Sequence, residues 1–193
     1  MTHADAPDSL IVIGGSAGAQ QPVQEMLAAL PNPLAAPIII ALHSVPMSKL
    51  TELLQRNSHH DIRRVEDGDT PEAGVIHIVP GGRHAFLRAG KIRLSDEVED
   101  SGFRPSIDML FMTAAAQYGP GAIGVILSGM LKDGMRGCQV IYDLGGRSIV
   151  QNPDDALYDS MPAAVIRADH PRAILSASEL SEWLISKVGT IET

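Results

Sequence analysis

A glycine-rich turn holds the first side chain that could act in catalysis. The segment Gly14-Gly15-Ser16-Ala17-Gly18 matches the pattern G-x-S-x-G, and it follows Leu10–Ile13, an apolar run typical of a strand buried on both faces. Pro22 then suits the first turn of a helix. In this context the glycines allow a sharp turn that exposes the serine hydroxyl, and the amide groups that begin the helix favour a developing oxyanion. The pattern therefore indicates that Ser16 is a nucleophile.

The same turn has a competing interpretation as a phosphate or dinucleotide loop, and two features count against it. Ser16 stands where the fingerprint G-x-G-x-x-G has its second glycine. The end of the next apolar run, Leu42-His43-Ser44, lacks the acidic residue that binds a ribose in dinucleotide-binding proteins.

A histidine and an aspartate follow the other two long apolar runs. His43 comes directly after Ile38–Leu42, and Asp133 lies in a glycine-flanked loop after Ala122–Leu127. Because the carboxyl ends of parallel strands meet at one edge of a sheet, we expect both side chains near Ser16. His43 would then act as the general base, and Asp133 would accept the proton on its Nδ1.

Each of these two assignments has an alternative. His84 is the next candidate for the base among the seven histidines. Asp133 could serve as the N-cap of the helix that follows it, either instead of the role as acid or in addition to it. Asp108 and Asp143 lie inside predicted helices and are less suited to the role of the acid.

The alternation of apolar runs with helical patterns predicts an α/β fold, a doubly wound and mostly parallel sheet with helices on both faces. Short extended runs at 75–79, 85–88 and 91–94 are separated by Pro-Gly and Gly turn signals, which predicts an antiparallel meander at the sheet edge. Ser176 and Glu179 have the spacing of a capping box for the last helix. The remaining helices are expected at 22–30, 47–56, 104–118, 134–144 and 162–167.

Length and composition exclude several classes of protein. The chain has 193 residues, which suits one domain, and a net charge of −8, which argues against binding nucleic acid. The single cysteine, Cys138, excludes an internal disulfide and a multi-cysteine metal site, and we expect no cofactor and no metal. The longest nearly apolar stretch, 34–42, is too short to cross a bilayer, so we expect no membrane insertion and a cytoplasmic location. Residues 1–8 carry no secretory signal and are expected to form a disordered tail.

Five motifs in order identify a family that the chain resembles. Over residues 10–188 it is similar to the catalytic domain of the bacterial chemotaxis protein-glutamate methylesterases (CheB-type). The matching segments are Ile13–Gly18 followed by the His43 strand end, Val79–His84, Arg104–Asp108, Leu127–Gly134 and Gln151-Asn152.

The resemblance assigns roles to six residues. The family's serine nucleophile, histidine base and aspartate fall on Ser16, His43 and Asp133. The resemblance also implies an oxyanion hole built from the backbone amides of Ala17 and Met130, and it places Arg104 near the substrate.

The implied activity is that of a carboxylic-ester hydrolase. The enzyme would remove methyl groups from γ-glutamyl methyl esters on the cytoplasmic helices of methyl-accepting chemoreceptors, and related enzymes also deamidate glutamine there. The family usually has an N-terminal receiver domain, but only about eight residues precede the first strand here, so we expect a single catalytic domain over residues 1–193. Such a chain would act alone or under the control of a separate regulatory protein.

Two departures from the family pattern keep other functions open. Ala17 replaces the usual threonine, and Leu131 replaces the usual glycine. A catalytically weakened binding or scaffold module is one alternative, and a stand-alone esterase for a non-receptor substrate is another. A basic cluster in the predicted meander either docks an acidic receptor surface or is simply solvated; its members are Arg83, Arg88, Lys91 and Arg93.

Overall fold

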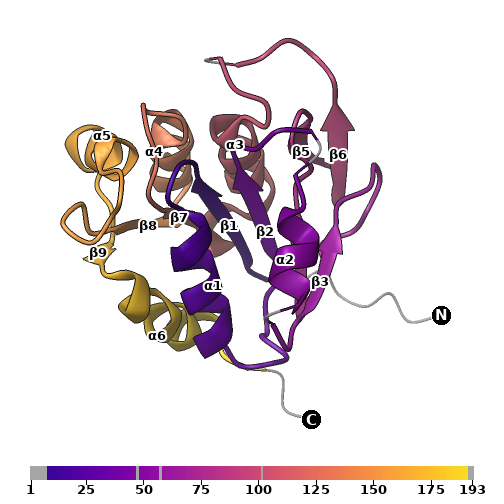
Figure 1. Ribbon diagram of the computed structural model, residues 1–193, viewed down its shortest axis with the longest axis horizontal. Coiled ribbons are helices and arrows are strands. Elements are labelled where there is room, and N and C mark those ends of the chain that lie inside the picture. Colours follow the sequence, from indigo (N-terminus) through magenta and orange to yellow (C-terminus); the bar gives the residue numbers. More distant parts are fainter. Residues whose placement is uncertain (1–7, 47, 57, 101, 191–193) are drawn as a thin grey trace.

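The computed structural model describes residues 8–46, 48–56, 58–100 and 102–190, and Figure 1 shows their arrangement. A seven-stranded sheet has the order β3-β4-β2-β1-β7-β8-β9, and every pair of neighbours in it is parallel. Its strands are β1 (Leu10–Gly15), β2 (Ile38–Leu42), β3 (Asp61–Arg64), β4 (Val75–Ile78), β7 (Ala122–Ile126), β8 (Arg147–Gln151) and β9 (Ala173–Leu175). The expectation of an α/β fold with a mostly parallel sheet is confirmed.

The central strands are buried on both faces because helices cover both sides of the sheet. All residues of β1, β2, β4 and β7 are buried. One core packs against α1, α2 and α6, and the other packs against α3, α4 and α5 (Figure 1). The helices are α1 (Gln20–Ala29), α2 (Leu50–Arg56), α3 (Ile107–Tyr118), α4 (Met135–Asp143), α5 (Ser160–Ala168) and α6 (Ala177–Val188), with a 3₁₀ turn η1 (Gly119–Gly121).

One part of the predicted topology is wrong. Val75–Ile78 does not belong to an antiparallel meander, because it pairs in parallel with β2 on one side and β3 on the other. Among the strands of the described ranges, only β5 (His84–Arg88) and β6 (Lys91–Ser95) pair in an antiparallel way, and they form a separate two-stranded sheet that packs against α3. The turn at Pro80-Gly81-Gly82, after Val79, takes the chain out of the main sheet and into β5 instead of back along β4. Burial on both faces of β4 is the property of a central parallel strand.

Strand β3 was not predicted, since its charged sequence leaves only Ile62 in the core. Predicted and observed helix ends agree within a few residues. The helix expected at 104–118 begins at Ile107 because Ser106 is its N-cap and accepts a hydrogen bond from the Met109 amide. The capping box of Ser176 and Glu179 is present at the start of α6.

Two predictions concern residues outside the described ranges. The start of the second helix was expected at residue 47, whereas α2 is described from Leu50, and nearly all of the expected tail lies in residues 1–7. Within the described ranges, none of the helices combines the length and the apolar character needed to cross a bilayer.

Candidate active site

Ser16 lies at the carboxyl edge of the sheet, between two neighbouring strand ends. Its amide donates to the carbonyl of Ser128 after β7 (3.0 Å), while the amide of His43 after β2 donates to the carbonyl of Gly15 (3.1 Å). Gly18 turns the chain toward α1 with φ = 78°, and a Cβ there would lie 2.6 Å from Ser128 Oγ. The turn therefore needs glycine at position 18, and it leaves Ser16 only half-buried.

The backbone around Ser16 offers two unused donors. A Cβ built on Gly129 would lie 3.1 Å from Ser16 Cβ, so the Gly129–Met130 segment runs beside the serine. The amides of Ala17 and Met130 donate no hydrogen bond to any residue in the described part of the chain. Both N–H groups are thus available to a ligand at the position that the sequence proposes for an oxyanion hole.

His43 and Asp133 are in direct contact, although they are 90 residues apart. The His43 Nε2 and the Asp133 Oδ2 are 2.8 Å apart, and both side chains are nearly inaccessible to solvent. The sequence prediction named the wrong nitrogen, because Asp133 approaches Nε2 and not Nδ1. A carboxylate only accepts hydrogen bonds, so Nε2 carries the proton in this pair. Nδ1 is buried and has no hydrogen-bond partner among the described residues, which leaves its lone pair free to accept a proton.

Asp133 also receives two backbone amides from another part of the fold. Its carboxylate accepts from the amides of Ile107 (2.8 Å) and Asp108 (3.0 Å), the first two residues of α3. The positive end of α3 therefore stabilises the negative charge that orients His43. The alternative in which Asp133 caps the helix that follows it is wrong, because Gly134 is the N-cap of α4 and no side chain caps that helix end.

An aromatic ring that sequence reasoning missed fixes the plane of His43. Phe103 stacks on the imidazole with ring centroids 3.9 Å apart and an angle of 4° between the planes. The next residue, Arg104, donates from Nη1 to the carbonyls of Asp96 (2.8 Å) and Glu97 (3.0 Å), which ties down the loop that carries the ring. A direct contact of Arg104 with substrate stays a prediction. The only signal in the sequence was the position of an aromatic residue immediately before the Arg-Pro-Ser motif.

We expect Phe103 to act as a positioning residue for His43. Replacing Phe103 with leucine keeps an apolar contact but removes the flat surface, so the imidazole should rotate more freely and kcat should fall about tenfold with a smaller change in KM. Phe103→Tyr, which keeps the ring, should restore most of the rate.

The NMR chemical shifts of the His43 imidazole distinguish this role from a loss of stability, because a less stable protein that kept the stacked ring would show the same shifts. The stacked ring should shift the carbon-bound protons of the His43 imidazole upfield in the wild type and in Phe103→Tyr, but not in Phe103→Leu. Unchanged imidazole shifts and an unchanged kcat in Phe103→Leu would contradict this role.

An arginine offsets part of the negative charge of a group of three carboxylates, one of which is Asp133. Oxygen atoms of Asp100, Asp108 and Asp133 lie within 4.8 Å of one another. Arg136 donates to Asp108 (2.7 Å) and to Asp100 (2.6 Å), and the Gly137 amide donates to Asp108 (2.8 Å). Burial raises the pKa of the Asp108 carboxyl, and Arg136 opposes that shift. The guanidinium thus supplies the positive charge that this cluster requires.

The competing candidates have structural roles. His84 is fully buried and both of its ring nitrogens are engaged: the Ser106 amide donates to Nδ1 (3.1 Å), and Nε2 donates to the Val98 carbonyl (3.1 Å). No lone pair of His84 is therefore left for a substrate proton. Cys138 is buried in α4, where burial raises the pKa of its thiol well above the usual range, so it contributes packing rather than reactivity.

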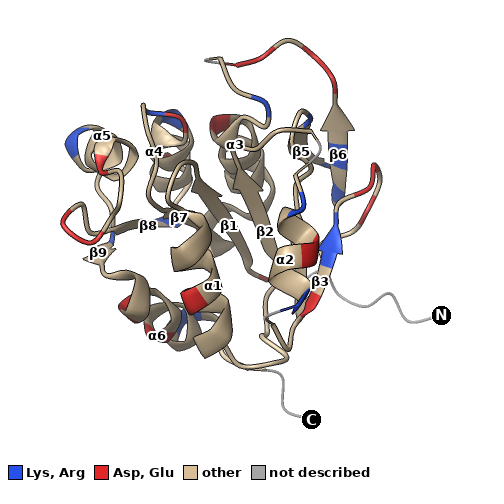
Figure 2. Cartoon of the chain, viewed as in Figure 1, with Lys and Arg blue, Asp and Glu red and all other residues tan. Residues whose placement is uncertain are grey.

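Most of the basic cluster on the β5–β6 hairpin is already paired. Arg83 binds Asp96 through Nε (2.7 Å) and Nη2 (3.1 Å), and Arg93 forms a salt bridge with Asp67 (2.9 Å). Lys91 donates to Thr70 Oγ1 (2.7 Å). Figure 2 shows basic residues on β6 beside acidic loops. These pairs favour a solvated hairpin face over a surface that docks an acidic receptor.

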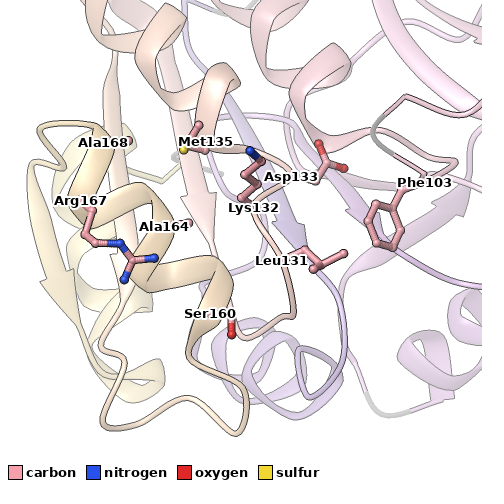
Figure 3. A pocket seen from close by; sticks show the side chains of 9 residues that line it. All are labelled: Phe103, Leu131, Lys132, Asp133, Met135, Ser160, Ala164, Arg167 and Ala168. Atoms are coloured by element: carbon pink, nitrogen blue, oxygen red, sulfur yellow. The ribbon is translucent and has the colours of Figure 1, made fainter.

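A pocket of about 530 Å³ opens beside the candidate triad, between α5 and the loop from β7 to α4 (Figure 3). Asp133 and Phe103 line its inner end, so the pocket touches both side chains that hold His43. The other lining residues are Leu131, Lys132, Met135, Ser160, Ala164, Arg167 and Ala168. This pocket is large enough for several side chains of a bound polypeptide.

The family assignment follows from comparison with known proteins. The sequence profile of the family described as CheB methylesterase matches residues 11–184. The chain belongs to this family. A solved structure, the CheB methylesterase catalytic domain of Thermotoga maritima, superimposes with a TM-score of 0.89 at 30% identity and covers 93% of this chain and 98% of that one.

Curated relatives in the CheB family carry the name protein-glutamate methylesterase/protein-glutamine glutaminase. One from Anaeromyxobacter dehalogenans is 35% identical over 177 residues, which is 91% of this chain and 52% of the relative. One from Salmonella typhimurium is 30% identical over 188 residues, which is 94% of this chain and 53% of the relative. The chain thus spans about half the length of these curated relatives.

Proposed function

We propose that this chain hydrolyses γ-glutamyl methyl esters of proteins through a serine acyl-enzyme, with Ser16 as nucleophile, His43 as base and Asp133 as the orienting acid. The observation that carries the proposal is the His43–Asp133 hydrogen bond at the strand end next to Ser16, which holds the proton on Nε2 and leaves Nδ1 free. Membership in the CheB family and the names of the relatives support the same reaction.

In the first step His43 Nδ1 removes the proton from Ser16 Oγ as the oxygen attacks the ester carbonyl. The tetrahedral intermediate carries its negative charge on the former carbonyl oxygen, and the amides of Ala17 and Met130 would donate to it. Asp133 stabilises the imidazolium, since its carboxylate is fixed by His43 and by two amides of α3. The imidazolium then protonates the leaving methoxide, and methanol departs.

In the second step water replaces the alcohol. His43 removes a proton from the water as it attacks the acyl-serine, and the second intermediate collapses to a free glutamate and Ser16. An amide substrate follows the same course with ammonia as the leaving group, so glutamine deamidation requires no further residue. The relatives' double name is consistent with both reactions.

The substrates that we propose are the cytoplasmic helices of methyl-accepting chemoreceptors, which places the enzyme in the cytoplasm and in chemotactic signalling. The support is membership in the CheB family, together with the pocket beside the site, which has room for a polypeptide. Regulation by a separate protein stays a prediction.

Methanol release from receptor membranes methylated with a radioactive methyl group tests the proposed function. The purified chain should release volatile label at a rate proportional to enzyme concentration, whereas boiled protein should not. Hydrolysis of p-nitrophenyl acetate without release from receptors would instead favour an esterase for a small ester. Failure with both substrates, together with failure of a fluorophosphonate to label Ser16, would favour the binding or scaffold module.

A further inference from the structure

The pocket beside the candidate triad has an apolar wall and two unpaired cations. Apolar side chains come from three separate segments, with Phe103 on one side, Leu131 and Met135 on the loop and first turn of α4, and Ala164 on α5. Leu131 is 58% exposed although it is large and apolar. An apolar surface that remains exposed at a concave site is typical of a binding surface.

The two cations line different parts of the pocket, since Lys132 lies beside Met135 and Asp133 whereas Arg167 lies on α5 (Figure 3). Lys132 and Arg167 are exposed, and neither forms a salt bridge with any residue of the described ranges, unlike Arg63, Arg83, Arg93 and Arg136. Figure 3 shows the Arg167 side chain extending from α5 toward the loop that carries Leu131 and Lys132. The pocket therefore offers two cations to an acidic group, although the chain as a whole carries a net charge of −8.

One face of α5 lines the pocket along most of the length of the helix. Ser160, Ala164, Arg167 and Ala168 occupy one stripe of the helix, at the spacing i, i+4, i+7 and i+8. From Ser160 to Arg167 the helix rises about 10 Å, or roughly two turns. At the inner end Phe103 and Asp133 contact His43. Because Phe103 and Asp133 both contact His43, a segment bound in this pocket would lie beside the candidate base.

We propose that this pocket binds the substrate segment next to the scissile ester, taking an apolar side chain against Leu131 and Phe103 and a flanking carboxylate against Lys132 and Arg167. The inference rests on the proposed function and adds to it the residues that would contact the segment flanking the ester. Arginine suits this task because its planar guanidinium binds a carboxylate through two parallel hydrogen bonds.

Binding of matched peptides to Ser16→Ala, which removes turnover, tests this proposal. Three fluorescent helical peptides each carry one glutamyl methyl ester. They differ only at the positions one and two turns away on both sides, which are all glutamate in the first peptide, all glutamine in the second and all lysine in the third. The glutamate peptide should bind about fivefold more tightly than the glutamine peptide, in line with ion pairs at a solvent-accessible rim. Adding Arg167→Gln should abolish this difference, and Arg167→Glu should reverse the preference toward the lysine peptide.

A matched control is available in Arg172. It is also an exposed arginine without a salt bridge within the described part of the chain, but it precedes β9 and so lies at the opposite edge of the sheet. Arg172→Gln should retain the fivefold preference. Equal affinity of Ser16→Ala for the three peptides, or a preference unchanged by Arg167→Glu, would overturn the proposal. Failure of the wild type to release methanol would instead refute the proposed function, because the binding assay does not depend on turnover.

Discussion

Ser16→Ala should lower methanol release by about a millionfold while leaving the fold intact. A change of this size is expected when the nucleophile of a serine–histidine–aspartate site is removed, because every later step requires the acyl-enzyme. The Ser16 side chain is half-buried and forms no hydrogen bond with the described residues, so its loss should shift the midpoint of thermal unfolding by only a few degrees. Rates of methanol release and a circular-dichroism melt provide the two measurements.

Ser44→Ala is the matched control, since Ser44 directly follows His43 at the same edge of the sheet. Wild type and Ser44→Ala should both react with a fluorophosphonate, and mass spectrometry should find the adduct on the peptide that contains Ser16. An adduct on another serine, or turnover retained by Ser16→Ala, would refute the assignment of the nucleophile.

Asp133→Asn should lower kcat about ten-thousandfold, and the reason is the tautomer of His43. With its Nδ2 in the place of Oδ2 and its oxygen still accepting from the Asp108 amide, the asparagine would donate to Nε2. This moves the imidazole proton to Nδ1, the nitrogen that has to accept the proton of Ser16 in the proposed mechanism. The change should also reduce the free energy of unfolding by about 2 kcal/mol, because the carboxylate that receives two amides of α3 loses its charge.

The tautomer itself is measurable. Nitrogen-15 NMR of the imidazole should show a protonated Nε2 in the wild type and a protonated Nδ1 in Asp133→Asn. Asp169→Asn provides a control for the loss of a buried charge, because Asp169 is 8% exposed and accepts from Ser148 Oγ (3.0 Å) at the far edge of the sheet. It should leave the imidazole spectrum unchanged. A wild-type spectrum with the proton on Nδ1 would disprove the arrangement inferred from the structure.

The orientation of His43 has a consequence for the leaving group. In the proposed mechanism, the Nδ1 that receives the serine proton also returns it to methoxide, so the alcohol would leave on the side of the ring away from Asp133. Phe103 covers one face of that ring and lines the pocket, so a segment bound there as proposed would touch the side chain that stacks on His43. Substrate binding and the orientation of His43 would then be linked through Phe103.

Where the sequence prediction failed, the failures have physical causes. Val75–Ile78 was predicted to be part of an antiparallel meander because turn signals follow it. The structure instead pairs this strand in parallel with β2 and β3, where it is buried on both faces. Its pairing depends on these two neighbours and not on the turn that follows. The alternative interpretation, in which Asp133 caps the helix that follows it, considered only nearby residues. Its carboxylate instead reaches the start of α3, 25 residues earlier in the chain.

The sequence by itself determined which residues follow the three central strands. Ser16, His43 and Asp133 were predicted as candidates because a buried strand can be recognised from its apolar run, and the ends of parallel strands share one edge of the sheet. Only the tertiary structure decided which nitrogen of His43 meets Asp133, that Phe103 covers the ring, and that Lys132 and Arg167 stay unpaired among the described residues. The physical reason is that these contacts depend on the angle at which distant loops and helices pack, and the local pattern of residue types carries no information about that angle.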